Sequence, residues 1–90
     1  MKITDVRIKL INKEDNKVKA LVSVTFDDTF VVHDVKVLTG NNDSTFVSMP
    51  SRKDLNGEFR DVAHPLNSEF RKYLCETVLE HYHKALKESY

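Results

Sequence analysis

The chain has 90 residues, the size of one domain, and a domain this small buries only about 60 to 65% of the surface that its unfolded chain exposes. Its 14 Lys and Arg residues balance 14 Asp and Glu residues, so the net charge provides no general attraction for nucleic acid. No apolar run approaches the roughly 20 residues of a membrane span, and the start MKITDVRIKL lacks the apolar core of a signal peptide, so we expect a cytoplasmic protein with no membrane role.

Two strands are predicted at the start of the chain. From Ile3 to Ile11, apolar or β-branched residues at even positions alternate with charged residues at odd positions, which is typical of a half-buried strand. The same alternation returns from Val18 to Phe26. Residues 12–17, NKEDNK, form a polar turn cluster between the two segments, which together predict a β-hairpin.

The segment FVVHDVKVL, residues 30–38, predicts a third strand, because β-branched residues are enriched in strands. The polar residues 27–29 separate it from the second strand. It is apolar on both faces: Val31, Val35 and Val37 lie with His33 on one, and Phe30, Val32 and Leu38 lie with Asp34 and Lys36 on the other. This pattern predicts a sheet that is covered on both sides or shared with a second chain.

A fourth strand, TFVSM, follows the turn residues 40–43 and ends at Pro50. Residues 51–66 show no clean periodicity, and Asn56-Gly57 predicts a tight turn within an exposed loop or small hairpin. A helix is then predicted, since Asn67 or Ser68 can cap its start. The apolar face of this helix is formed by Phe70, Leu74, Val78, Leu79, Tyr82 and Leu86.

These elements predict a single α+β domain over residues 1–90. A four-stranded antiparallel meander occupies residues 1–50, a basic loop occupies 51–66, and a C-terminal helix over 67–88 packs on the sheet. The small core and the apolar faces of the second and third strands leave surface that a second copy would cover, which predicts a dimer.

Basic residues in the 51–66 loop are the first candidate site. Arg52 and Lys53 follow a strand end, and Arg60 returns to them across the Asn56-Gly57 turn. Guanidinium and ammonium groups bind phosphate oxygens, so this loop suits a polyanion, although a solvated charged loop is the ordinary alternative. Asp54 and Glu58 in the same loop weaken its positive potential.

Two further groups of cations extend the candidate surface. Arg71 and Lys72 lie in the first turns of the predicted helix, where cations oppose the helix dipole and solvent exposure is the ordinary interpretation. A secondary patch is formed on the outer face of the first hairpin by Arg7, Lys9, Lys17 and Lys19. Lysines on exposed strands commonly prevent edge pairing, and that interpretation of the patch is favoured.

The histidines, the cysteine and the aromatic residues are the other side chains that could take part in chemistry or binding. His33 with Asp34, and His64, would suit acid–base catalysis only if they converge in space. His81 and His83 are two positions apart on a helix, which is a poor spacing for zinc, and Cys75 is expected to behave as a small apolar residue of the core. Of the three phenylalanines near the cations, Phe46 and Phe70 are expected to be buried and Phe59 to be available for stacking on a base. We therefore expect no metal, no cofactor and no catalytic site.

The motifs FVSMPSRK, GEFRD and AHPLNSEFR, with ITDVRIKLI and FVVHDVKV upstream, resemble the stage V sporulation protein G (SpoVG) family of small bacterial regulators. The resemblance covers nearly the whole chain, with the motifs in the same order. It implies an α+β fold, a homodimer, and binding of DNA and RNA by proteins linked to sporulation and septation. It also makes Arg52 and Lys53 the first residues to carry over as phosphate contacts.

We therefore expect a non-enzymatic regulator of gene expression that binds DNA or RNA. The alternative is a protein-interaction module that binds septation or regulatory proteins during division-septum formation, without physiological nucleic-acid binding. Such a module would use exposed apolar residues and would tolerate salt better than phosphate contacts do.

Overall fold

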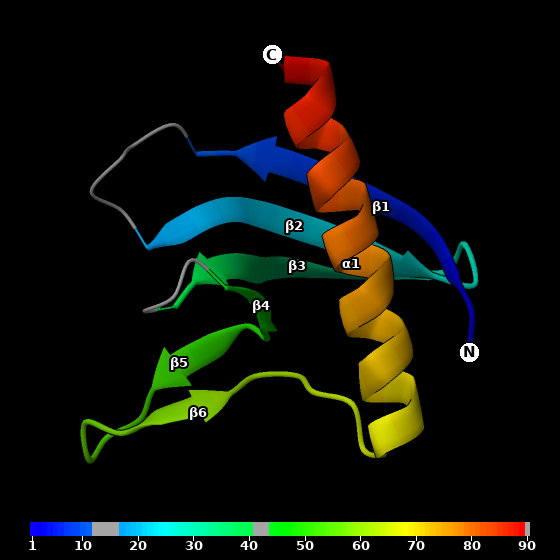
Figure 1. Ribbon diagram of the computed structural model, residues 1–90. Coiled ribbons are helices and arrows are strands. Elements are labelled where there is room, and N and C mark those ends of the chain that lie inside the picture. The colour runs from blue at the N-terminus through cyan, green and yellow to red at the C-terminus, as the bar shows by residue number, and fades with distance from the viewer. Residues whose placement is uncertain (12–16, 41–43, 90) are drawn as a thin grey trace.

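The computed structural model describes residues 1–11, 17–40 and 44–89. Its elements are β1 (Ile3–Leu10), β2 (Val18–Phe26), β3 (Phe30–Thr39), β4 (Thr45–Ser48), β5 (Ser51–Lys53), β6 (Phe59–Asp61) and α1 (Ser68–Ser89). Strands β1 to β4 form one antiparallel sheet in chain order, and β5 and β6 form a separate two-stranded hairpin. Figure 1 shows α1 crossing one face of the sheet and the β5–β6 hairpin lying beyond β4. The predicted α+β arrangement of a four-stranded meander and a C-terminal helix is confirmed.

The core lies between α1 and the sheet, and β2 supplies much of it. Every second residue of β2 from Ala20 to Phe26 is buried, as the period-2 alternation predicts. The other buried apolar side chains are Val35, Val37, Met49, Leu74, Val78 and Tyr82. Fully burying one Val or Leu side chain contributes about 1.5 to 3 kcal/mol, so this cluster holds the helix on one face of the sheet and leaves the opposite face open.

Strand β3 contains a β-bulge that changes which residues face the core. The register across the bulge is that Val22 opposes Val35 and Val24 opposes Val32. Ser23 of β2 is therefore opposed by two residues, His33 and Asp34. Asp34 has a φ of 64°, in the left-handed region, where Asp is tolerated better than most residues because its short polar side chain bonds locally.

The bulge overturns the assignment of β3 faces made from sequence. Val32 packs against the core together with Val35 and Val37, whereas Val31 is exposed. The assignment was wrong because the bulge inserts one extra residue into β3. The alternation shifts by one position there, so the core-facing residues are even-numbered before the bulge and odd-numbered after it.

The expected burial of the two phenylalanines also needs correction. Phe46 is 47% exposed, because its neighbour Val47 packs against the core and the alternation of β4 turns Phe46 to the other face. Phe70 is half-buried at the start of α1, with its ring centroid 5.9 Å from that of Phe26. Of Phe26, Phe46 and Phe70, only Phe26 is buried.

A local signal defines the start of α1. The Asn67 side chain accepts a hydrogen bond from the Phe70 backbone amide at 2.7 Å, which confirms the predicted helix cap. The helix continues to Ser89.

The turn clusters predicted at 12–17 and 40–43 fall largely outside the described residues, which omit 12–16 and 41–43.

Candidate functional site

The β5–β6 hairpin holds the three cations predicted in the 51–66 loop. Arg52 opposes Arg60 directly across the two strands, and Lys53 opposes Phe59. Every residue of both strands is exposed. The predicted Asn56-Gly57 turn is confirmed, with the Gly57 amide donating to the Asp54 carbonyl at 3.0 Å and Gly57 itself at a φ of 81°.

Asp54 organises the turn of this hairpin. Its Oδ1 accepts the backbone amides of Asn56 and Glu58, both at 2.9 Å, and its Oδ2 accepts Arg60 Nε at 2.8 Å. The Arg60 guanidinium, followed by the Glu58 amide, holds the pKa of the Asp54 carboxyl below its usual value. The carboxylate that was expected to weaken the loop's potential is therefore engaged with Arg60 and the turn.

Arg52 and Lys53 remain available to an external anion. Neither forms an ion pair with a residue in the described ranges. They line a hollow of about 480 Å³ together with Asp54, Leu55, Arg60, Asp61 and Val62. Arg52, Lys53 and Arg60 thus place three cationic groups around one hollow, and groups of this kind can donate to phosphate oxygens.

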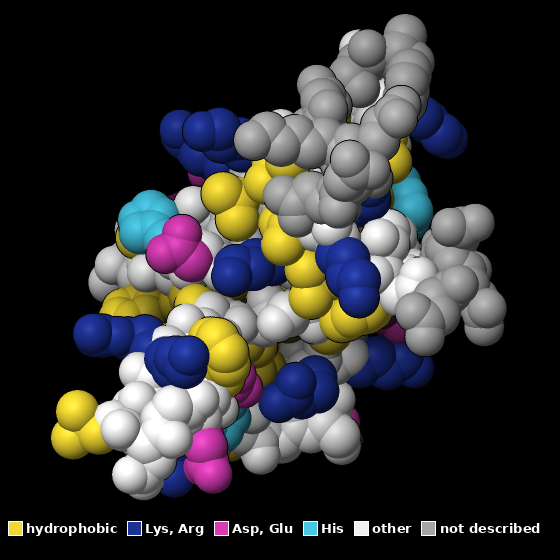
Figure 2. All heavy atoms as spheres, turned by 90° about the vertical axis from the view of Figure 1, so that its left-hand side faces the viewer, with side chains coloured by type: hydrophobic (Ala, Val, Ile, Leu, Met, Phe, Trp, Pro, Cys, Tyr) yellow, Lys and Arg dark blue, Asp and Glu magenta, His cyan; other side chains and the backbone are white. Residues whose placement is uncertain are grey.

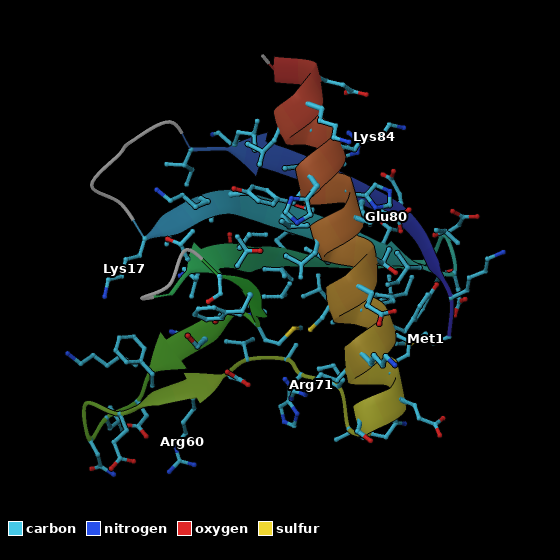
Figure 3. The ribbon with its side chains drawn as sticks, viewed as in Figure 1. Met1, Lys17, Arg60, Arg71, Glu80 and Lys84 are labelled. Atoms are coloured by element: carbon cyan, nitrogen blue, oxygen red, sulfur yellow. The ribbon has the colours of Figure 1, made fainter. Side chains whose placement is uncertain are left out.

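The predicted cations of α1 lie apart from the hairpin. Figure 3 shows Arg60 on the hairpin and Arg71 on the helix, at separate places in the molecule. Neither Arg71 nor Lys72 lines the hairpin hollow, and Lys72 Nζ lies 4.0 Å from Glu76 Oε1 on its own helix. The structure therefore does not join these two groups into one site.

The secondary patch lies on the face of the sheet opposite α1, which we call the open face. Ile8 and Leu10 of β1 pack against the core, so Arg7 and Lys9 between and beside them point to the open face. Arg7 Nε is 3.1 Å from Asp5 Oδ2, so the two residues form an ion pair that is exposed to solvent. Lys17 is exposed and Lys19 half-buried at the start of β2.

The register adds Lys36 to the open face, a residue that was not singled out from the sequence. Lys9 opposes Leu21, and Leu21 in turn opposes Lys36 on β3. Lys36 and Arg52 also line a common hollow of about 660 Å³, which connects the open face to the hairpin. The sequence does indicate that Lys36 faces away from the core, since it alternates with the buried Val35 and Val37. Which residues lie beside Lys36 on the neighbouring strands is known only once the strand register is known. Figure 2 faces the left-hand side of Figure 1 and shows Lys and Arg side chains spread over that side, with hydrophobic side chains between them.

The histidines do not gather into one site. Ser23 Oγ and His33 Nδ1 lie 2.8 Å apart and share a hydrogen bond on the open face, beside Asp34. His64 lines a different hollow, and its Nδ1 donates to the Pro65 carbonyl at 3.1 Å. The convergence of His33, Asp34 and His64 that acid–base catalysis would need is therefore not found.

The remaining histidines and the cysteine lie on α1. His81 Nδ1 donates to the Thr77 carbonyl at 2.8 Å, and the His83 ring lies 5.4 Å from that of Tyr82. Cys75 is half-buried, and burial raises the pKa of its thiol more than nearby Arg71 lowers it. This thiol is therefore protonated at neutral pH.

An apolar groove of about 710 Å³ lies between the start of α1 and the end of β2. Three large apolar side chains on its rim are exposed: Leu66 to 93%, Met1 to 75% and Phe30 to 64%. Phe30 also lines the hollow that joins Lys36 to Arg52. Exposed apolar surface of this kind is typical of a surface that another molecule covers.

Comparison with known proteins identifies relatives along almost the entire chain. The model of the SpoVG family matches residues 1–84. A protein of Caldanaerobacter subterraneus subsp. tengcongensis is 56% identical over 85 residues, which cover 94% of this chain and 91% of that protein. A Clostridioides difficile protein is 55% identical over 86 residues, which cover 96% of this chain and 91% of that protein. Both are named "Putative septation protein SpoVG".

The structure also bears on membrane insertion. Among the described residues, no helix combines the length and the apolar character that crossing a bilayer requires.

Proposed function

This chain belongs to the SpoVG family, and we propose that it is a non-enzymatic regulator of gene expression that binds DNA or RNA. The observation that carries the proposal is the β5–β6 hairpin. It presents Arg52 and Lys53, which form no ion pair with a carboxylate of the described residues, beside an Arg60 that Asp54 holds in place.

The hairpin suits phosphate contacts for a specific chemical reason. The planar guanidinium of Arg52 can donate to two oxygens of one phosphate, and the Lys53 ammonium adds a second positive charge to the same hairpin. Binding of this kind releases counterions from the nucleic acid, so the affinity falls steeply as salt rises. Because the chain has no net charge, these local contacts supply the attraction.

We further propose that the protein is a homodimer in which a second copy covers the apolar groove. The rim side chains Met1, Phe30 and Leu66 are all exposed and leave apolar surface that a second copy would cover. A two-fold axis beside the groove would pair the same patch on both copies and would double the number of cationic hairpins. Light scattering should then give twice the chain mass of 10.4 kDa. A strictly monomeric species at micromolar concentration contradicts this assembly.

The test of nucleic-acid binding is a fluorescence-anisotropy titration of labelled single-stranded RNA and duplex DNA across a salt series. The Arg52→Ala/Lys53→Ala variant should bind both ligands more weakly and lower the salt slope by about 0.7 to 0.9 per lost phosphate contact. The matched control is Lys84→Ala/Lys87→Ala, which removes the same charge from exposed positions of α1, away from the hairpin. An unchanged slope in the hairpin variant would refute this site.

The second candidate function is a protein-interaction module in division-septum formation. The relatives' name points to septation, and the exposed groove rim supplies apolar surface for a partner protein. If wild-type protein binds neither RNA nor DNA at low salt, this function replaces the first. Partner binding should then tolerate salt and be weakened by Leu66→Ser, whereas the hairpin variant should bind the partner normally.

A further inference from the structure

We propose that the open face of the β1–β4 sheet is a platform for unpaired nucleic-acid strands, with phosphates held by Lys9 and Lys36 and a base stacked on Phe46. This inference rests on the nucleic-acid-binding function proposed above. It names the ligand class as single-stranded and adds a surface outside the hairpin.

The first observation is a row of side chains that crosses all four strands. The row runs through Lys9, Leu21, Lys36 and Ser48, each opposing the next. Neighbouring strands lie about 4.8 Å apart, so the two lysines of the row are separated by roughly 10 Å at the backbone. Between them stands an apolar side chain, and a hydroxyl ends the row.

The second observation is an exposed aromatic ring beside this row. Leu38 and Phe46 oppose each other one step further along β3 and β4, on the same face as Lys36. Phe46 is 47% exposed, so part of its ring is open to solvent on this face. Cations and apolar groups therefore alternate across the open face.

This alternation favours unpaired strands over a duplex. A duplex presents phosphates on its outside and hides the flat faces of its bases, so docking it here would press phosphates against Leu21, Leu38 and Phe46. An unpaired strand offers both groups at once, because its bases can cover the apolar side chains while its phosphates reach the lysines.

Charges on the open face agree with a polyanion. Lys9 and Lys36 form no ion pair within residues 1–11, 17–40 and 44–89. Of the nearby carboxylates, Asp5 is paired with Arg7, and Asp34 lies at the bulge. The hollow lined by Lys36 and Arg52 lies between the open face and the hairpin, so a strand on the sheet can reach the hairpin through it, although Asp34 and apolar side chains also line this hollow.

The test compares two surfaces with two ligands by fluorescence anisotropy. The ligands are a labelled oligouridine of about 12 nucleotides and a labelled duplex DNA of the same length. The open-face variants are Lys9→Ala/Lys36→Ala and Phe46→Ala, the hairpin variant is Arg52→Ala/Lys53→Ala, and the charge-matched control is Lys84→Ala/Lys87→Ala. We expect Lys9→Ala/Lys36→Ala to weaken oligouridine binding about 10-fold or more at low salt and to change duplex binding less than 3-fold. Phe46→Ala should weaken oligouridine binding about 5-fold or more without changing the salt slope.

The outcomes separate this inference from the function on which it rests. If Arg52→Ala/Lys53→Ala abolishes oligouridine binding while the open-face variants bind normally, the open-face platform is wrong and the regulator function stands. If the open-face variants lose both ligands equally, the surface is a general cation patch and the single-strand assignment is wrong. If wild-type protein binds neither ligand, both proposals fail. Circular dichroism of each variant checks that the sheet is intact.

Discussion

The β5–β6 hairpin and the open face both display cations, but the chain assembles them in different ways. The hairpin gathers Arg52, Lys53 and Arg60 within a few residues, and a single carboxylate, Asp54, fixes its turn. The open face draws Lys9 and Lys36 from strands that meet only through the sheet. The hairpin therefore depends on local hydrogen bonds, whereas the open face depends on the core packed behind it.

The largest expected effect tests whether the core supports the sheet but not the hairpin. Leu74, on the side of α1 that packs against the sheet, is 1% exposed, and Leu74→Ala should lower the free energy of unfolding by about 2 to 5 kcal/mol. Phe59 is 73% exposed on the hairpin, so Phe59→Ala should change it by less than about 0.5 kcal/mol. Urea unfolding followed by circular dichroism at one protein concentration measures both. Similar losses in the two variants would mean that the hairpin packs as part of the core.

The second-largest expected effect tests the hydrogen bonds that Asp54 accepts within the hairpin turn. Asp54→Ala removes the acceptor for two turn amides, and amide exchange at Asn56 and Glu58 should accelerate at least about 10-fold. Asp54→Asn is the matched control, since its side-chain oxygen can still accept those amides while Arg60 loses its anionic partner. We expect Asp54→Asn to keep the turn and to bind RNA more tightly. Equal exchange rates in the two variants would rule out Asp54 as the organiser of the turn.

The same contrast explains which features the sequence predicts. The Asn56-Gly57 turn and the Asn67 cap depend on residues next to each other in the chain, and both were predicted correctly. The bulge at Asp34 was not predicted. The surrounding residues have the β-branched composition of a regular strand, so nothing in the sequence indicates that Asp34 adopts a left-handed backbone conformation. Phe46 was misassigned for a related reason, since its alternation alone does not say which face of a short strand meets the core.

The same distinction between neighbours in the chain and neighbours in the fold applies to the residues of the candidate site. Arg52, Lys53 and Arg60 were predicted to be together and are together on one hairpin. Arg71 was placed beside them by its position in the sequence, but α1 carries it to another part of the molecule. Lys36 joined the open face only through its register with Leu21, and long-range register is information that a single sequence does not display.

The smallest expected effect is a response of the hairpin to acid. The Arg60 guanidinium and the turn amides stabilise the ionised Asp54 carboxyl, so its pKa in the folded protein lies below the usual 3.8. A depressed pKa contributes stability that is complete above the unfolded value and is lost as the pH falls through the folded one. The turn should therefore remain closed at pH 3.8 and open only at lower pH, which the backbone amide shifts of Asn56 and Glu58 in an NMR titration would report. Asp54→Asn should lack this transition. A midpoint at or above 3.8 would show that Arg60 does not hold the carboxylate in solution, and the hairpin would then present three cations that act independently.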